Sequence, residues 1–122
     1  MNKYRMGWDE VEELVDNIAI HYDFRKVTNL YGLPRGGLIP AVMLSHRTGI
    51  PLSHQLTRGT LIVDDIYDTG QTLNRYLDKN FKAVTLVNKL NHERLYSAKQ
   101  INDWIVFPWE TENSSKVDYL TK

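Results

Sequence analysis

Apolar side chains recur along the chain at two different spacings, and each spacing predicts one kind of element. Over residues 8–22 they recur every three or four positions, which places an apolar stripe on one face of a helix. This stripe consists of Trp8, Val11, Leu14, Val15, Ile18 and Tyr22. Residues 38–49 predict a second helix, because Pro40 is tolerated in a first turn and Gly49 is a common helix stop. A weaker helical signal resumes at 71–77.

Short apolar runs separate these helices and predict strands. The runs at 60–65 and 82–89 contain few polar residues, as expected of strands that are covered on both faces. Further strands are predicted at 27–31, 51–56 and 103–109. Strands that alternate with helices predict a parallel sheet between two helical layers. We therefore expect a three-layer α/β/α fold with a mainly parallel, five-stranded sheet.

Composition adds limits on the kind of protein. The length of 122 residues suits a single domain over residues 1–122, in which the polar tail 110–122 is expected to fray. With 15 basic and 15 acidic residues the net charge is zero, which argues against a general nucleic-acid binder. The chain has no cysteine, no apolar run that could span a membrane and no signal-peptide core, so we expect a cytoplasmic protein.

The stretch 61–73, LIVDDIYDTGQTL, combines a predicted buried strand with three acids. Asp64 and Asp65 fall at the carboxyl end of this strand, and Asp68 lies past it. Because side chains alternate along a strand, the two adjacent acids cannot point the same way. Either one faces a pocket while the other braces a loop, or both splay around a ligand. In parallel sheets this edge is where ligands bind.

Residues 68–72 have the features of an anion cradle. Backbone N–H groups at the start of the predicted helix are unpaired, and the helix dipole favours a phosphate there. Gly70 permits a tight turn, and Thr69 and Thr72 add hydroxyl donors. Neighbouring carboxylates accept hydrogen bonds from sugar hydroxyls and attract Mg²⁺. A phosphorylated ribose would satisfy both parts of this loop.

The pattern hydrophobic-Asp-Asp-x-x-Asp-Thr-Gly-x-Thr resembles the signature with which type I phosphoribosyltransferases bind 5-phosphoribosyl 1-pyrophosphate (PRPP). The resemblance extends over nearly the whole chain, and GLPRGG at 32–37 resembles the pyrophosphate loop of that family, which often contains a cis peptide, here between Pro34 and Arg35. The resemblance implies that PRPP contacts Asp64, Asp65, Asp68, Thr69, Gly70, Gln71, Thr72, Arg35, Gly36 and Gly37. It also implies Mg²⁺ as cofactor, held by Asp64 and Asp65 directly or through water.

Two further matches concern the base. Lys89 ends the fourth predicted strand, as in 6-oxopurine phosphoribosyltransferases such as those for xanthine, guanine and hypoxanthine. Trp104-Ile105, followed by Pro108-Trp109, resembles the purine-stacking segment of that group. The resemblance implies that Lys89 meets the ring carbonyl, the Trp104 indole stacks on the purine and the Ile105 backbone reads the ring edge. A core tryptophan and a solvated strand end are the structural alternatives.

These matches imply a reaction. PRPP and a purine base, expected to be a 6-oxopurine, would give a nucleoside 5′-monophosphate and pyrophosphate in purine salvage. Asp68 would accept a proton from the base, and Arg35 would stabilise the departing pyrophosphate. The contact surface of a homodimer is one expectation for Trp8 and Trp109; neither a membrane nor a nucleic acid is an expected partner.

One departure from the family pattern favours a different function. Family members usually carry a long mobile loop before the acidic strand, whereas the interval 53–60 is only SHQLTRGT. His54, Thr57 and Arg58 could form a reduced flap, or a neighbouring subunit could supply one. The alternative is a non-catalytic regulator that binds PRPP or a nucleotide and has a truncated flap.

Overall fold

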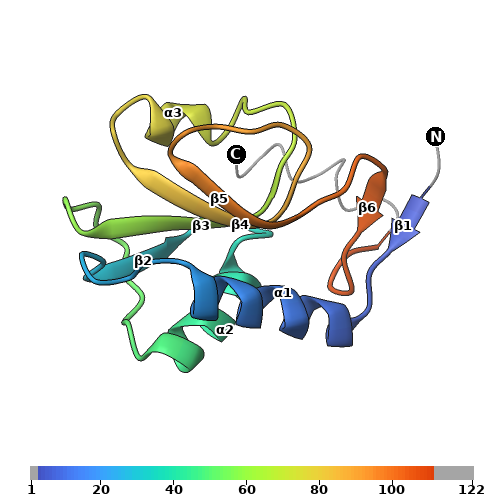
Figure 1. Ribbon diagram of the computed structural model, residues 1–122, viewed down its shortest axis with the longest axis horizontal. Helices are drawn as coiled ribbons and strands as arrows, with labels where there is room; N and C mark the ends of the chain where they lie inside the picture. Colours follow the sequence, from blue (N-terminus) through green and yellow to red (C-terminus); the bar gives the residue numbers. More distant parts are fainter. Residues whose placement is uncertain (1–2, 112–122) are drawn as a thin grey trace.

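Strands and helices alternate through most of the computed structural model, which describes residues 3–111 (Figure 1). The elements are β1 (Lys3–Arg5), α1 (Trp8–His21), β2 (Asn29–Gly32), α2 (Leu38–Thr48), β3 (Thr60–Tyr67), α3 (Asn74–Leu77), β4 (Lys82–Asn88), β5 (Leu95–Gln100) and β6 (Trp104–Val106). Most of the predicted tail lies outside the described residues. Among residues 3–111, no helix has both the length and the apolar character that a bilayer crossing needs.

The main sheet has four parallel strands in the order β2-β3-β4-β5. The predicted parallel sheet is therefore confirmed, but two of its expected members differ. The segment 51–56 contributes only one bridge, between Leu30 and Leu52. The fourth strand is instead Leu95–Gln100, whose half-buried, partly polar sequence LYSAKQ lacks the apolar run that marks β3 and β4.

The last strand lies outside the main sheet. β6 pairs in parallel with β1 in a separate two-stranded sheet, with Lys3 opposite Trp104 and Tyr4 opposite Ile105. This small sheet lies beyond the end of β5, from which only residues 101–103 separate it (Figure 1). Sequence periodicity could not predict this pairing, because its two strands have three residues each and are about a hundred positions apart.

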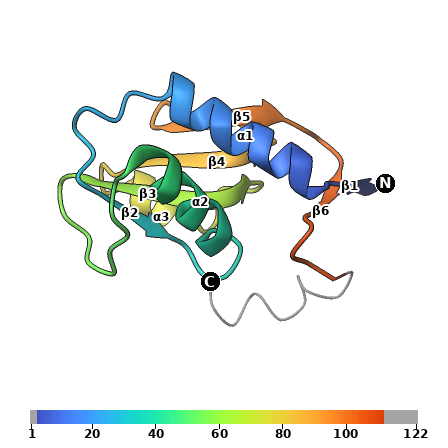
Figure 2. The same ribbon diagram turned by 90° about the horizontal axis from the view of Figure 1, so that it is seen from below.

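Helices cover both faces of the main sheet, as the three-layer prediction requires. α1 packs on β4 and β5, and α2 packs on β2 and β3, on the same face (Figure 2). The core on this face includes the predicted helical stripe residues Val11, Leu14, Val15 and Ile18. A second core beneath α3 consists of Leu33, Ile62, Tyr67, Leu73, Leu77 and Ala83.

The third helix is shorter than predicted. Residues 71–73 form a turn, and only Asn74–Leu77 are helical. The anion cradle predicted at 68–72 therefore precedes the helix and does not form its N-terminus, and a single helical turn contributes little dipole to it. Asn80 adopts a left-handed conformation with φ of 71° and ends the segment before β4. Helix α2, in contrast, ends as predicted at Gly49, where φ is 77°.

The packing of the central strand predicts a clear stability difference. Leu86 on β4 has no exposed surface and lies in the core beneath α1 and α2, whereas Ile20 on α1 is 73% exposed. Leu86→Ala should lower the free energy of unfolding by about 2–5 kcal/mol, because it removes buried methyl groups and leaves a cavity. Ile20→Ala should change it by less than about 0.5 kcal/mol. Urea denaturation of both variants measures this, and equal losses would contradict the described core.

Candidate functional site

The carboxyl end of β3 carries two adjacent buried carboxylates that face different loops. Asp64 lines a pocket together with the residues that follow β3. Asp65 points to the loop before α2, where a Cβ added at Gly36 would overlap its carboxylate. The Asp65 N–H donates to Asp64 Oδ1 over 2.8 Å, which holds the two residues in this arrangement. The two acids therefore diverge, as side-chain alternation predicts.

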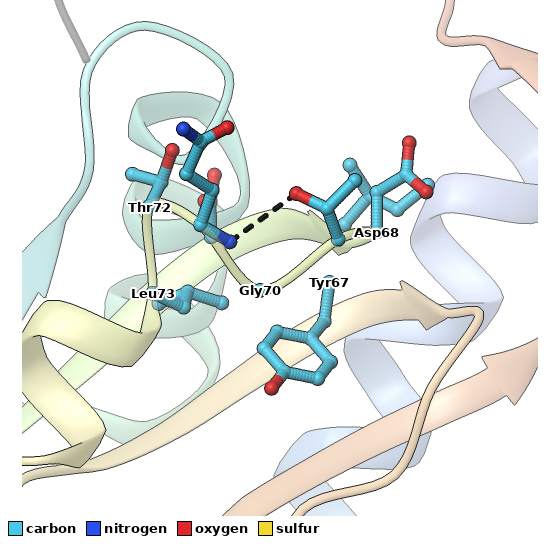
Figure 3. Close-up of a pocket in the computed structure, with 9 residues that line it drawn as sticks. Tyr67, Asp68, Gly70, Thr72 and Leu73 are labelled. Atoms are coloured by element: carbon cyan, nitrogen blue, oxygen red, sulfur yellow. Dashed lines mark hydrogen bonds between the residues drawn. The ribbon is translucent and has the colours of Figure 1, made fainter.

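The pocket beside Asp64 has a volume of about 190 Å³. Its other lining residues are Ile66, Tyr67, Asp68, Thr69, Gly70, Gln71, Thr72 and Leu73. Figure 3 shows the side chains of Asp68 and Thr72 on one side of this loop and the Tyr67 ring on the other. The pocket thus brings together all five residues of the predicted anion cradle, Asp68–Thr72, with one of the two strand-end acids.

Local contacts shape the loop that surrounds this pocket. The Gln71 N–H donates to Thr69 Oγ1 over 3.2 Å, and the Asn74 N–H donates to Gly70 O over 2.8 Å (Figure 3 shows the first). The Tyr67 hydroxyl donates to Asn74 Oδ1 over 2.7 Å beneath them. Gly70 has φ of 84°, and a Cβ there would crowd Asn74 and the Tyr67 hydroxyl. The conformation therefore requires glycine at this position.

The second predicted loop, Leu33–Gly37, lies against the same end of β3. The Leu33 N–H donates to Val63 O over 2.9 Å, and the Gly37 N–H donates to Leu33 O over 2.8 Å. A Cβ at Gly37 would overlap Val63 O, so a second close approach requires glycine. The Pro34–Arg35 peptide is cis, as the sequence resemblance predicts, and Arg35 is exposed. Both loops therefore meet at the carboxyl end of one strand.

The buried carboxylate of Asp65 has one oxygen without a hydrogen-bond partner among the described residues. Asp65 is 2% exposed, and this oxygen, Oδ1, is fully buried. An orphaned carboxylate oxygen is expensive to bury, so a ligand hydroxyl or a cation fits here. Residues 3–111 contain no group of three or more His, Cys, Asp or Glu side chains that could hold a metal alone. Asp64 and Asp65 are the carboxylates here that could hold a divalent cation, which would need phosphate oxygens of a substrate as further ligands.

Lys89 lies beside Asp68 at the neighbouring strand end. Its Nζ is 3.7 Å from Asp68 Oδ1, and its backbone N–H donates to Tyr67 O over 2.9 Å. The Lys89 side chain is 18% exposed and that of Asp68 is 53% exposed. Most of the Lys89 side chain is therefore buried, unlike the solvated strand end that is the structural alternative. A partly buried ammonium group borders the predicted anion cradle.

Trp104 and Ile105 lie on β6, which follows closely on the end of the main sheet. The Ile101 N–H donates to Asn88 O over 3.1 Å, so the chain passes the end of β4 just before it enters β6. Trp104 is 43% exposed, while Ile105 is buried. The indole therefore has a free surface, and a core role for Trp104 does not fit. Trp109 instead stacks on Phe107, with ring centroids 5.0 Å apart, and also contacts Trp8.

The short interval before β3 lies at the opposite end of the sheet. The Thr28 N–H donates to Gly59 O, and the Thr60 hydroxyl donates to Asn29 Oδ1, both at the amino ends of β2 and β3. Thr57 is held there as well, because its N–H donates to Thr60 Oγ1 over 2.8 Å. Of the two alternatives for a flap, the one built from His54, Thr57 and Arg58 does not fit, because this loop lies at the end of the sheet away from the site. Seven residues return the chain directly to the start of β3.

Sequence reasoning missed two tyrosines beside this site. Tyr31 on β2 and Tyr76 on α3 have ring centroids 6.3 Å apart. The pKa of Tyr76 is raised, first because the phenol is partly buried and further because Tyr31 and the Asp64 carboxylate lie near it. Tyr31 pairs with Ile62 in the sheet, so alternation along β2 could have placed it on the same face as Asp64. Tyr76 had no such signal.

Several solved structures are similar to this chain over nearly its whole length. A purine phosphoribosyltransferase from Pyrococcus horikoshii Ot3 superposes with a TM-score of 0.76 and 29% identity, over 91% of this chain and 95% of that one. A xanthine-guanine-hypoxanthine phosphoribosyltransferase from Helicobacter pylori gives a TM-score of 0.67 with 18% identity, over 94% and 98%. A hypothetical protein from Neisseria gonorrhoeae with bound ppGpp gives 0.73 with 17% identity, over 98% and 96%.

No family model matches the sequence, and no curated protein matches it either. The structural matches nevertheless span nearly the whole chain and agree with the motifs at 32–37 and 61–73. The chain therefore has the fold of the type I phosphoribosyltransferases, and it resembles the purine phosphoribosyltransferases of that family.

Proposed function

We propose that this chain transfers the 5-phosphoribosyl group of PRPP to a 6-oxopurine, giving a nucleoside 5′-monophosphate and pyrophosphate in purine salvage. One observation carries the proposal: the Asp65 carboxylate lies against Gly36, so that the acidic loop and the Leu33–Gly37 loop form one site. A PRPP molecule has a phosphate at one end, a diphosphate at the other and hydroxyls between them. Two anion-binding loops separated by carboxylates suit that order. The 29% identity to a purine phosphoribosyltransferase supports the same reaction class.

Each part of PRPP has a candidate partner. The 5′-phosphate would bind in the pocket formed by Asp68–Thr72, where backbone amides and the Thr69 and Thr72 hydroxyls can donate. The ribose hydroxyls would donate to Asp64 and Asp65, and the orphaned Oδ1 of Asp65 supports this assignment. The pyrophosphate would face Arg35 and the backbone of Gly36 and Gly37. Bound Mg²⁺ would supply positive charge that neutralises the phosphate oxygens.

The residues of this chain also suit the bond exchange. A ring nitrogen of the base forms a bond to C1 of the ribose while the bond from C1 to the pyrophosphate oxygen breaks. Asp68 would accept the proton that the base loses, and Arg35 would stabilise the negative charge on the leaving pyrophosphate. Lys89 would donate to the 6-oxo oxygen, and its position 3.7 Å from Asp68 would let the two side chains contact neighbouring polar atoms along one edge of the base. Trp104 would stack on the ring, and the Ile105 backbone would read its edge.

A non-catalytic regulator that binds PRPP or a nucleotide is the alternative function. The short loop at 53–59 speaks for it, because that loop returns to the amino end of β3 and covers no part of the site. The Neisseria gonorrhoeae structure with bound ppGpp shares the fold, but at 17% identity it supports the fold alone. The purine phosphoribosyltransferases among the similar structures do not favour the regulator.

Pyrophosphate release from PRPP and Mg²⁺ tests the proposal directly. We expect release with one or more of guanine, hypoxanthine and xanthine and none with adenine, because Lys89 can donate to a 6-oxo group but cannot accept from a 6-amino group. Uracil is the pyrimidine control, since it has a carbonyl for Lys89 but only one ring. Release with adenine alone would overturn the base assignment. PRPP binding by calorimetry without release for any base would favour the regulator.

Asp68→Asn separates the chemical step from binding. The amide keeps the size of the side chain but cannot accept a proton, so kcat should fall about a hundredfold or more. The Kd for PRPP should stay within about threefold of the wild-type value, because the half-exposed ion pair between Asp68 and Lys89 contributes little free energy to the site. Asp78→Asn, at the exposed end of α3, is the matched control and should keep wild-type turnover. Undiminished kcat in Asp68→Asn would remove Asp68 from this role.

Gly36→Ala tests whether the two loops act as one site. The new Cβ would displace the Asp65 carboxylate or the loop, so the KM for PRPP should rise by about tenfold, the effect of losing ~1.4 kcal/mol of binding. Gly7→Ala, whose added Cβ meets nothing within 4 Å, serves as the control and should keep the wild-type KM. Circular dichroism verifies that both variants are folded. A folded Gly36→Ala protein with unchanged KM for PRPP would contradict the joint site.

A further inference from the structure

A cluster of three side chains connects the small sheet to the main body of the protein. The Tyr4 hydroxyl on β1 donates to Glu10 Oε2 on α1 over 2.5 Å. Lys99 Nζ on β5 donates to the same Glu10 oxygen over 3.4 Å and lies 5.9 Å from the centroid of the Tyr4 ring. The neighbouring elements β1 and α1 and the distant strand β5 therefore meet at one carboxylate oxygen.

We propose that Glu10 is a positioning residue for the base-binding strand, because it ties β1, and through β1 the Trp104 end of β6, to the main sheet. The inference rests on the proposed function, in which Trp104 stacks on the purine. It assigns to Tyr4, Glu10 and Lys99 a task that none of the sequence motifs indicates.

The ladder between β1 and β6 has one buried end and one exposed end. At the first end, Met6 and Val106 are buried, and the Met6 N–H donates to Val106 O over 2.9 Å. At the other end, Lys3 and Trp104 are opposite each other and both are exposed. Tyr4 is the residue next to this exposed pair. Its hydroxyl contact therefore restrains the end of the small sheet that carries Trp104.

Lys99, the other partner of Glu10, connects this carboxylate to the main sheet. Lys99 is paired in register with Val87 on β4, two residues before Lys89. The contacts of Tyr4 and Lys99 with Glu10 therefore fix the position of Trp104 relative to the end of β4. This strand end carries Lys89, the candidate partner of the 6-oxo group. Glu10 is 23% exposed, and partial burial strengthens a charge-assisted hydrogen bond. The pKa of Tyr4 is raised, chiefly by its hydrogen bond to the Glu10 carboxylate, so the phenol remains a donor at neutral pH.

Helix α1 does not depend on this cluster for its own place. Four of its stripe residues, Val11, Leu14, Val15 and Ile18, are buried in the main core, whereas Trp8 is 50% exposed. The Tyr96 hydroxyl on β5 also donates to Asn17 Oδ1 over 2.7 Å. Removal of the Glu10 contacts should therefore loosen the exposed end of the small sheet and leave α1 on β5. The contact of Tyr96 with Asn17 is a second partly buried phenol bond to the same helix, and it provides a matched control.

The experiment compares Tyr4→Phe, Glu10→Ala and Glu10→Gln with the control Tyr96→Phe. In Tyr4→Phe and Glu10→Ala, hydrogen exchange at residues 104–106 should accelerate about tenfold, with exchange in β3 and β4 unchanged. The KM for the base should rise about tenfold in these two variants, while the KM for PRPP remains within about twofold. Glu10→Gln keeps an acceptor for Tyr4 and should recover most of both losses. Tyr96→Phe should alter neither exchange at 104–106 nor the KM for the base.

Three results would overturn the inference. The first is unchanged hydrogen exchange at 104–106 in both Tyr4→Phe and Glu10→Ala. The second is faster exchange there without a rise in the KM for the base. The third is a rise in the KM for the base in Tyr96→Phe that equals the rise in Tyr4→Phe. If the wild-type protein releases no pyrophosphate with any base, the proposed function fails. Exchange at 104–106 then decides alone whether Glu10 holds the small sheet.

Discussion

The burial of the Asp65 carboxylate against the backbone of Gly36 is the constraint on which the site depends. A charged group that is 2% exposed needs compensation, and one of its oxygens has none within the described residues. Glycine at 36 and at 37 lets the loop approach β3 closely enough to use backbone groups, because a Cβ at either position would overlap Asp65 or Val63 O. The two loops proposed to bind opposite ends of one ligand are thus held near a single strand end.

Backbone hydrogen bonds just beyond the parallel strands hold further candidate residues near the buried acids. Tyr67 O, at the end of β3, accepts from the Lys89 N–H, and Asn88 O accepts from the Ile101 N–H. These two bonds bring the candidate base-binding residues to the same edge as the acid pair. Backbone pairing at strand ends therefore assembles the site. Trp104 and Ile105 lie on a separate small sheet, which the contact of Tyr4 with Glu10 positions.

The short loop at 53–59 sets this chain apart from the usual pattern of the type I phosphoribosyltransferases, whose fold it has. Hydrogen bonds from Thr28, Thr57 and Thr60 hold it at the amino ends of β2 and β3. A site without a closing loop has fewer means to exclude water from the reacting centre. The proposed enzyme would then rely on the fixed geometry of Asp64, Asp65 and the two loops for its catalysis, and not on closure around the substrate.

Local chemistry made much of this protein predictable. Apolar stripes and runs marked α1, α2, β3 and β4, because a buried element must be apolar on each covered face. The glycine, threonines and acids of 61–73 predicted an anion-binding loop, because few residues tolerate a close backbone approach or accept from hydroxyls. The resemblance to the type I phosphoribosyltransferases added the segment 32–37 as a second one. The divergence of Asp64 and Asp65 followed from strand alternation. These features depend on a residue and its near neighbours, which the sequence displays.

The remaining features depend on which distant segments meet. β5 is half-buried at a sheet edge, so its polar residues concealed it, and β6 leaves the main sheet for a partner near the amino end of the chain. The helix predicted at 71–77 shrinks to four residues, since Gly70 and the contact of Tyr67 with Asn74 bend the chain into a turn. The sequence by itself determined the residue types and loops of the site. Only the tertiary structure decided how they assemble, because strand pairing and packing are set by contacts between segments that no local pattern records.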